Sequence, residues 1–336
     1  MSINISNIGL PSFLLMGFPG THATNIWISL LLIPVYLVSI MGNGLILIIM
    51  QTNSQLREPM HLLLSMLAAT DLCLALSTLP TVLGVFCFDY GRIHFNACLI
   101  QLFFIHTLCV MESSILLAMA FDRYVAICNP LRYTSILLPL ISKIGLVSVI
   151  RGVLIVLPAT CLLKRLSYCD NTALSHAFCY HPDVIKLACS DTNINNKYGL
   201  AVILCTYPLD SLCIMFSYMM ILRTVLSGAR EAGHLKALNT CASHLCVVLL
   251  FYIPLIGLTL AHRYAQKGST LLLILMGGVF LVVPPALNPI VYSIKTKQIR
   301  NAICERFCGK KESTNPNKVA LRVNSVSDFV ALERDV

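Results

Sequence analysis

The sequence is short of charge. Of its 336 residues, 12% are charged and 57% are hydrophobic, whereas a soluble domain has about 25% charged and about 45–50% apolar residues. This composition argues against a water-soluble fold. The net charge of +9 does not indicate nucleic-acid binding, because long apolar runs keep the basic residues apart instead of gathering them on one polar face.

The sequence also lacks the short motifs of common catalytic sites. It contains no G-x-S-x-G, no H-E-x-x-H and no phosphate-binding loop, and its histidines and cysteines do not follow metal-ligand spacing. The fifteen cysteines form no repeated C-x-x-C pairs, so most are expected to be small buried side chains. Internal duplication, which is typical of transporters, is absent as well. An enzyme is not expected, and a transporter or channel is a weak alternative.

What the sequence does contain is a series of seven apolar runs. Each approaches the roughly 20 residues that a helix needs to cross about 30 Å of hydrocarbon. The runs cover residues 27–50, 59–83, 98–121, 144–163, 198–222, 237–261 and 271–294. They predict an all-α membrane protein with a seven-transmembrane helix bundle over residues 27–294. An extracellular N-terminal segment of residues 1–26 and a cytoplasmic C-terminal tail of residues 295–336 flank this bundle.

The basic residues of the loops predict the orientation. Most of them fall in loops that face the cytoplasm if the N-terminus is outside, as the positive-inside rule requires. Asn4 begins an N-x-S glycosylation sequon, which agrees with an outside N-terminus. Cys304 and Cys308 lie just beyond the last run, where they are either palmitoylated or plain reduced cysteines.

Four cysteines fall outside the membrane in this topology. Cys98 opens the third run, and Cys169, Cys179 and Cys189 lie in the long loop that follows the fourth. All four face an oxidising compartment, where disulfides persist. A bond from this loop to Cys98 would make the loop a lid over the bundle, and the alternative is four unpaired thiols.

Ionisable side chains inside the apolar runs are costly unless they face the bundle interior. Asp71 and Glu112 lie at similar depth in the second and third runs, and Asn43 and Asn288 could join them. Two carboxylates in one dry space repel each other, so a bound cation such as sodium or a shared proton would compensate. The alternative is an uncharged hydrogen-bond network that only specifies packing.

Arg151 and Asp210 are two further charged residues inside apolar runs, the fourth and the fifth. They either pair with each other or find separate backbone partners. The sequence assigns neither of them a function.

Two motifs mark the inner ends of the third and seventh runs. The first is Asp122-Arg123-Tyr124, and the second is Asn288-Pro289-Ile290-Val291-Tyr292. An arginine that is held by a neighbouring aspartate and released when helices move suits a two-state switch read from the cytoplasm. Either motif alone arises by chance, but their joint positions favour such a switch.

With these motifs the sequence resembles the rhodopsin-like G-protein-coupled receptors, and among them the odorant receptors, over nearly the whole chain. The segments that carry the resemblance are PMH at 59–61, LAATDL at 67–72, MAFDRYVAIC at 119–128, Ser217-Tyr218 and KALNTCASHL at 236–245. His61, Phe121 and the long second outer loop resemble the class I, fish-like branch. That branch is often associated with carboxylic acids and other water-soluble ligands.

The resemblance implies a function. It implies a receptor in the plasma membrane, expected in olfactory cilia, that detects small organic odorants. It also implies partners, namely membrane lipid and a heterotrimeric G protein of the stimulatory, olfactory type that acts through adenylate cyclase and cyclic AMP. No cofactor is implied other than a possible sodium ion. The alternative function is a non-olfactory chemosensory receptor of the same architecture.

The resemblance also implies roles for individual residues. Cys98 would pair with Cys179, and Cys169 with Cys189. Glu112 matches the acidic residue that accompanies the helix-two aspartate in odorant receptors, which supports the sodium interpretation. Where other receptors of the superfamily carry a tryptophan, this chain has Tyr252. The residues assigned to the G-protein switch are Asp122, Arg123, Tyr124, Tyr218, Tyr252 and Tyr292.

A ligand site can be predicted from helical spacing. Thr259 and Arg263 are four residues apart near the outer end of the sixth run, so they share one face. An arginine there could hold a carboxylate by paired, charge-assisted hydrogen bonds, or it could extend to the lipid headgroups. His106 and His181 would donate further bonds, unless His106 is a core histidine. The predicted apolar wall residues are Phe103, Leu200, Ile203 and Leu255.

Overall fold

The computed structural model describes residues 12–17, 22–53, 58–169, 172–227, 231–264 and 270–308. Within these ranges the side chains of 22–24, 231–240, 263–264, 270–272, 295, 297 and 307–308 are not described. The sequon at Asn4 and the side chain of Cys308 therefore lie outside the described residues.

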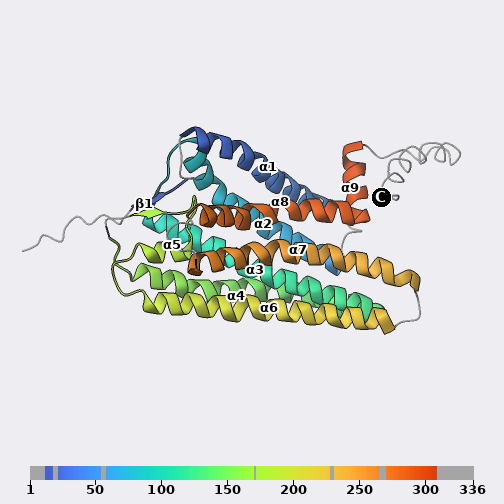
Figure 1. The fold of residues 1–336 in the computed structure, drawn as a ribbon. Coiled ribbons are helices and arrows are strands. Elements are labelled where there is room, and N and C mark those ends of the chain that lie inside the picture. The colour runs from blue at the N-terminus through green and yellow to red at the C-terminus, as the bar shows by residue number, and fades with distance from the viewer. Residues whose placement is uncertain are drawn as a thin grey trace, which may run out of the picture.

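Seven of the helices are long and apolar enough to cross a membrane, which confirms the predicted fold class. A helix suits this role because it satisfies every backbone polar group within its own segment, where no water is available. The seven are α1 (His22–Thr52), α2 (Pro59–Cys87), α3 (Phe95–Cys128), α4 (Tyr133–Lys164), α6 (Asn193–Ser227), α7 (Glu231–Tyr264) and α8 (Thr270–Lys295). They lie side by side as one bundle (Figure 1).

Helix α3 is the centre of the bundle. It contacts α2, α4, α6 and α7. In the apolar stretch of α3 that could span the membrane, 67% is buried inside the protein, compared with 17% in the corresponding stretch of α6. Leu102, Leu116 and Met119 are fully buried along it. Large apolar side chains on the outer helices are instead exposed, such as Trp27 on α1 and Leu212 on α6. The outer helices therefore present apolar surface to the lipid, and the polar residues of α3 lie in the interior.

The outer end carries a small sheet that the sequence did not predict. It consists of β1 (Ser12–Leu15), β2 (Arg92–His94) and β3 (Ala173–Leu174) in the order β2-β1-β3. Strand β1 pairs antiparallel with β2 and parallel with β3. The Phe13 ring of β1 is buried, with its centroid 5.7 Å from that of Phe95 and 5.3 Å from that of Tyr168. The N-terminal segment is thus tied to the outer end of the bundle.

The lid, residues 165–169 and 172–192 of the second outer loop, is held from several sides. It contains the short helix α5 (His181–Lys186). Disulfides join Cys98 to Cys179 and Cys169 to Cys189, the pairs that the family resemblance implies. The Cys179 amide donates to Gln101 Oε1 at 3.0 Å. Both a covalent bond and a hydrogen bond therefore fix the lid to α3.

The inner end holds the 3-10 turn η2 (Pro130–Arg132) and the helix α9 (Lys297–Cys308). In Figure 1, α9 turns away from the end of α8. Ile299 and Ala302 are buried, three residues apart on one face of α9, and Cys304 is exposed. The sequence interpretation ended the last helix before this segment, because three basic residues obscure the apolar spacing.

Replacing Cys98 by serine is expected to prevent the protein from reaching the cell surface. Loss of a native disulfide costs about 2–5 kcal/mol in small secreted domains, and this bond anchors the lid to α3. Surface staining of an epitope-tagged chain measures the effect. Cys73→Ser is the matched control, because Cys73 is free and exposed. Wild-type surface levels for Cys98→Ser would show that the lid does not depend on this bond.

Candidate functional site

A cavity of about 450 Å³ lies in the outer half of the bundle beneath the lid. Its walls come from α3, α4, α6, α7, α8 and the lid. Ligand pockets of small molecules usually measure about 300–1,000 Å³ and are mostly apolar, with a few polar groups that orient the ligand. This cavity fits that description, because its aliphatic walls are interrupted by only a few histidine, tyrosine, threonine and amide side chains.

The structure brings six of the eight predicted ligand-site residues to this cavity. They are His106, His181, Leu200, Ile203, Leu255 and Thr259. The side chain of Arg263 lies outside the described residues, although its backbone continues α7 four residues beyond Thr259. Residues that line the cavity but were not predicted include Tyr180, Lys186, Tyr207, His262 and Phe280.

The prediction that Phe103 is a wall residue is wrong. The cavity is lined by Leu102 and His106, four residues apart on α3, and Phe103 is not among its lining residues. One residue along a helix is a rotation of about 100°, which places Phe103 at the edge of the cavity-facing side of α3, and its ring packs against Phe104 with centroids 5.9 Å apart. The sequence placed residues on α3 without the rotation of the helix about its axis, which only the neighbouring helices determine.

The two predicted histidines offer neutral hydrogen-bonding groups to the cavity. His106 Nδ1 lies 3.0 Å from Leu102 O, and because a carbonyl only accepts, Nδ1 carries the proton and Nε2 is left as an acceptor. Burial, with a smaller effect of His106, lowers the pKa of His181 to about 3, so its ring is uncharged at neutral pH. His181 Nε2 is buried with no hydrogen-bond partner among the described residues. It is available to a ligand.

Below the cavity a polar network joins four helices. Tyr252 of α7 shares a hydrogen bond of 2.9 Å with Ser113 of α3, whose hydroxyl donates to Asp210 Oδ2 of α6 at 2.6 Å. Arg151 Nη1 of α4 lies 2.9 Å from the same Asp210 oxygen and donates to Ser114 Oγ. The question that the sequence left open is answered here, because Arg151 and Asp210 pair with each other. Their link to Tyr252 was not foreseen.

A second polar cluster lies between α1, α2, α3 and α8. Asn288 Nδ2 donates to Asp71 Oδ2 at 2.9 Å, and Asn43 Nδ2 donates to Pro285 O at 2.8 Å. Asp71 and Glu112 are both buried, at 0% and 1% exposure, and they interact electrostatically. Asp71 Oδ1 and Glu112 Oε1 have no hydrogen-bond partner within the described part of the chain. Each of the two buried carboxylates thus has one oxygen left without a hydrogen-bond partner.

Five of the six predicted switch residues lie at the inner end, and the sixth, Tyr252, belongs to the network below the cavity. Arg123 Nη2 lies 3.0 Å from Asp122 Oδ2, and Tyr133 donates to Asp122 Oδ1 at 2.9 Å. Tyr218 is hydrogen-bonded to His244, which joins α6 to α7. The remaining two predicted tyrosines lie nearby: Tyr292 donates to Met119 Sδ at 3.9 Å, and Tyr124 packs against Ile221, Val225 and Cys241.

This architecture defines a rhodopsin-like receptor fold, and solved structures agree. Squid rhodopsin matches with a TM-score of 0.69 at 16% sequence identity, covering 88% of this chain and 90% of its own. At that identity the match supports the fold alone. The chain is thus a seven-helix membrane bundle with the rhodopsin fold, with a cavity beneath a lid at its outer end.

The chain belongs to the olfactory receptor family. A model of this family, described as olfactory receptor, matches residues 32–310. Olfactory receptor 51G2 of Homo sapiens is 53% identical and covers 91% of this chain and 98% of the relative. Olfactory receptor 51E2 of Mus musculus is 47% identical and covers 88% and 93%. These relatives agree with the class I interpretation. The chain is therefore a multi-pass receptor of the plasma membrane and not an enzyme, with a small-molecule ligand and a heterotrimeric G protein as partners.

Proposed function

We propose that this olfactory receptor detects small aliphatic carboxylic acids and signals through a stimulatory G protein to adenylate cyclase and cyclic AMP. The observation that carries the ligand class is the cavity itself. Its apolar walls suit a short hydrocarbon chain, and its polar groups gather at the outer end, where His106, His181 and Thr259 lie. A ligand with one polar head and one aliphatic tail matches this division.

A positive charge from Arg263 at the outer end of the cavity would favour an acid over an alcohol or an ester. His181 is neutral and cannot supply the positive charge, and Lys186 is already 3.6 Å from Asp183. Arg263 follows Thr259 by four residues on α7, on the same face of the helix. A guanidinium at this place would bind a carboxylate in a bidentate manner, while His181, whose Nε2 has no partner among the described residues, could donate to one of its oxygens.

Replacing Arg263 by alanine is expected to weaken the response to an aliphatic acid about tenfold or more, because hydrogen bonds to charged groups contribute about 1.5–3 kcal/mol. Arg263→Lys keeps the charge but loses the planar geometry, so an intermediate loss is expected. Wild type, Arg263→Lys and Arg263→Ala should all respond equally to the methyl ester of the same acid. Dose–response curves at matched surface expression measure this.

Arg92→Ala is the matched control for Arg263, because Arg92 is an exposed arginine of the same outer end, on β2. Equal acid responses of wild type, Arg263→Lys and Arg263→Ala would contradict the carboxylic-acid proposal. A panel of acids, alcohols and esters on the wild type then identifies the ligand class that replaces it.

The signalling route that we propose runs down α7. A ligand in the cavity lies above Tyr252, whose hydroxyl is hydrogen-bonded to Ser113, which in turn donates to Asp210. Movement of α7 at this point would change the Tyr218–His244 contact at the inner end. Arg123 would then leave Asp122 and face the G protein. The Tyr252–Ser113 contact joins α7 to α3 and the Tyr218–His244 contact joins α7 to α6, so a rotation of α7 would be transmitted to both helices.

Arg123→Ala is expected to abolish ligand-evoked cyclic AMP in cells that express a stimulatory G protein, with surface expression largely intact. Asp122 keeps its hydrogen bond from Tyr133 when the arginine is removed, so the inner end is expected to stay folded. Lys143→Ala removes an exposed basic residue elsewhere on the chain and is the control. A normal cyclic AMP response in surface-matched Arg123→Ala cells would remove Arg123 from the switch.

The cluster at Asp71 and Glu112 is proposed to bind a sodium ion. The unpartnered oxygens Asp71 Oδ1 and Glu112 Oε1 are oxygen ligands of the kind that such an ion prefers, and a buried cation would relieve the repulsion between the two carboxylates. Asn43 and Asn288 hold the surrounding backbone and Asp71 in place.

Sodium chloride is expected to raise the melting temperature of the purified receptor above its value in choline chloride at equal ionic strength, because a ligand that binds only the folded state stabilises it. Asp71→Asn should remove this difference. Ser65→Ala changes a half-buried hydroxyl on the same helix and should retain it. A melting temperature that depends on pH but not on sodium would favour the shared proton instead.

The tissue remains part of the proposal. Expression in olfactory cilia is expected from the family, and a non-olfactory chemosensory role is the second candidate. Both share the same site chemistry. Immunostaining of the endogenous protein in olfactory epithelium separates them, because its absence from cilia would favour the second.

A further inference from the structure

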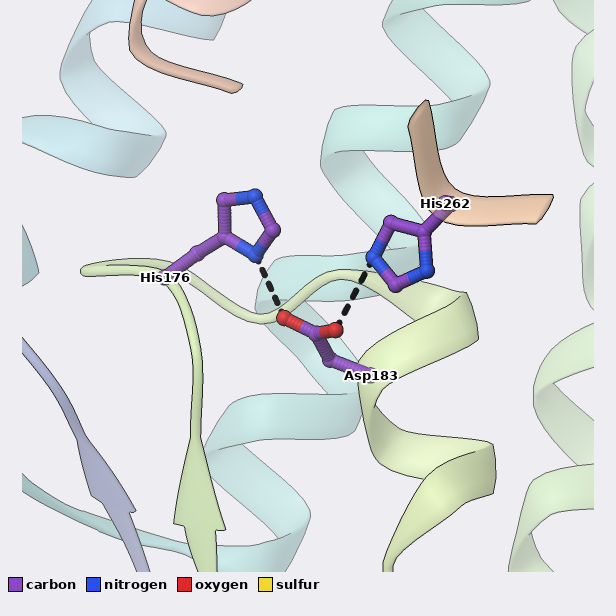
Figure 2. A group of neighbouring side chains, drawn as sticks. All are labelled: His176, Asp183 and His262. Carbon is purple, nitrogen blue, oxygen red and sulfur yellow. Dashed lines mark hydrogen bonds and ion pairs between the residues drawn. The ribbon is translucent and has the colours of Figure 1, made fainter. Parts of the chain in front are cut away.

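Three side chains at the top of the cavity converge from separate parts of the chain. Figure 2 shows His176 of the lid, Asp183 of α5 and His262 of α7 directed toward one another. The potential ligand atoms of the three lie within 4.8 Å of one another. His176 Nδ1 contacts Asp183 Oδ2, and His262 Nε2 lies 2.9 Å from Asp183 Oδ1. We propose that His176, Asp183 and His262 form a binding site for a divalent transition-metal ion of the zinc type.

The hydrogen bonds of His176 orient it as a metal ligand. Its Nε2 lies 3.0 Å from Leu273 O of α8, and a carbonyl only accepts, so Nε2 carries a proton. Its Nδ1 is hydrogen-bonded to Asp183 Oδ2, and because a carboxylate only accepts, Nδ1 carries the proton that a bound metal ion would displace. Histidines that bind metals almost always donate their other ring N–H to a carbonyl or carboxylate in this way, which fixes the ring and its tautomer.

The packing around His176 leaves it no other orientation. A Cβ on Gly277 of α8 would overlap its ring, and the ring packs against Phe178 with centroids 5.1 Å apart. The His176 ring therefore lies between the rest of the lid and α8, with Nδ1 directed at Asp183. A site whose ligands are fixed before the ion arrives loses little conformational entropy on binding.

The contacts within the cluster are incomplete as a hydrogen-bond network. The side chains of His176, Asp183 and His262 are 1%, 2% and 5% exposed. Although His262 Nε2 and Asp183 Oδ1 are close, their alignment is not that of a hydrogen bond, and neither atom has another hydrogen-bond partner within the described residues. Lys186 Nζ, on an exposed side chain, lies 3.6 Å from Asp183 Oδ1 as an ion pair. Buried polar atoms without partners are unfavourable, and a cation between the two rings and the carboxylate would satisfy both.

The ligand set selects the class of metal. Two imidazole nitrogens and one carboxylate oxygen are typical of zinc sites that keep a fourth position open. A tetrahedral ion with bonds of about 2.0–2.2 Å holds its ligand atoms about 3.3–3.6 Å apart, so small side-chain shifts bring these three atoms to it. Calcium and magnesium prefer sites made wholly of oxygen and are not expected here.

An ion at this place would join the lid to the outer end of α7. His262 lies ten residues after Tyr252 on α7, and both His262 and the lid residue Tyr180 line the ligand cavity. A bond between lid and helix restrains the same helix that the proposed switch needs to move. The metal would thus modulate the response to a ligand, without being needed for the ligand to bind.

The test uses the full chain without a polyhistidine tag, purified in lipid nanodiscs and without agonist, so that its outcome is independent of the proposed ligand class. Zinc binding is measured by competition with a chromophoric zinc chelator and by the shift in melting temperature. One equivalent per receptor and a zinc-dependent rise in melting temperature are expected. His262→Gln and Asp183→Asn keep similar shape but are poor ligands, and each should weaken zinc binding at least tenfold.

A second set of variants separates binding from folding. His262→Cys supplies a different zinc ligand at the same position and should restore affinity to within tenfold of wild type, which a purely structural histidine would not do. His94→Ala removes an exposed histidine of the outer end and should leave binding unchanged. No stoichiometric binding to the wild type would overturn the proposal, as would equal binding to His262→Gln. In that case the cluster is only an ion pair that fastens the lid.

Discussion

A polar group within the hydrocarbon of a membrane has no water to bind, so it must find its partner inside the protein. The arrangement of this receptor follows from that constraint. The acidic side chains Asp71, Glu112 and Asp210 of the membrane spans are buried, and Glu112 belongs to α3, which contacts four other long helices. Glu112, Ser113 and Asp122 are all buried on this one helix, and each belongs to a different polar cluster.

The ligand cavity and two of the polar clusters on α3 define three levels in the receptor. The outermost holds the ligand cavity and its lid, the middle level holds Ser113 with Asp210 and Tyr252, and the inner level holds the ion pair of Asp122. Apolar side chains such as Leu116 and Met119 fill the space between them. Because interiors are close-packed, these levels can move only as rigid pieces, which suits a protein that must carry a signal across a membrane without opening a path for ions.

Much of this arrangement can be predicted from the sequence, because an ionisable residue in an apolar run is conspicuous. Asp71, Glu112 and Asp210 were found in this way, and helical spacing placed His106 and Thr259 in the cavity. What failed was information that depends on two elements at once. The rotation of α3 about its axis determines that Phe103 does not line the cavity. The sequence left open whether Arg151 and Asp210 pair, because the pair joins α4 to α6, and a single sequence does not show which helices are neighbours.

Short elements escaped prediction for related reasons. Strands β2 and β3 are only 3 and 2 residues long, too short for an alternating pattern to be recognised. The amphipathic spacing of α9 was hidden among basic residues, and His176 and His262 are 86 positions apart in the printed sequence. Long-range proximity is a property of the fold, and spacing along one chain carries no signal for it.

The sheet at the outer end has a consequence for the order in which the protein is made. Strand β1 is the first element of the chain, yet its partners begin 80 residues later at β2 and 161 residues later at β3, counted from Ser12 to Arg92 and to Ala173. During synthesis β1 must wait outside the membrane until four helices have been inserted and the lid has been translocated. Because β1 is the middle strand, the lid cannot complete its pairing without it. The cap is therefore assembled late, and chaperones of the lumen meet a receptor whose first residues are among the last to fold.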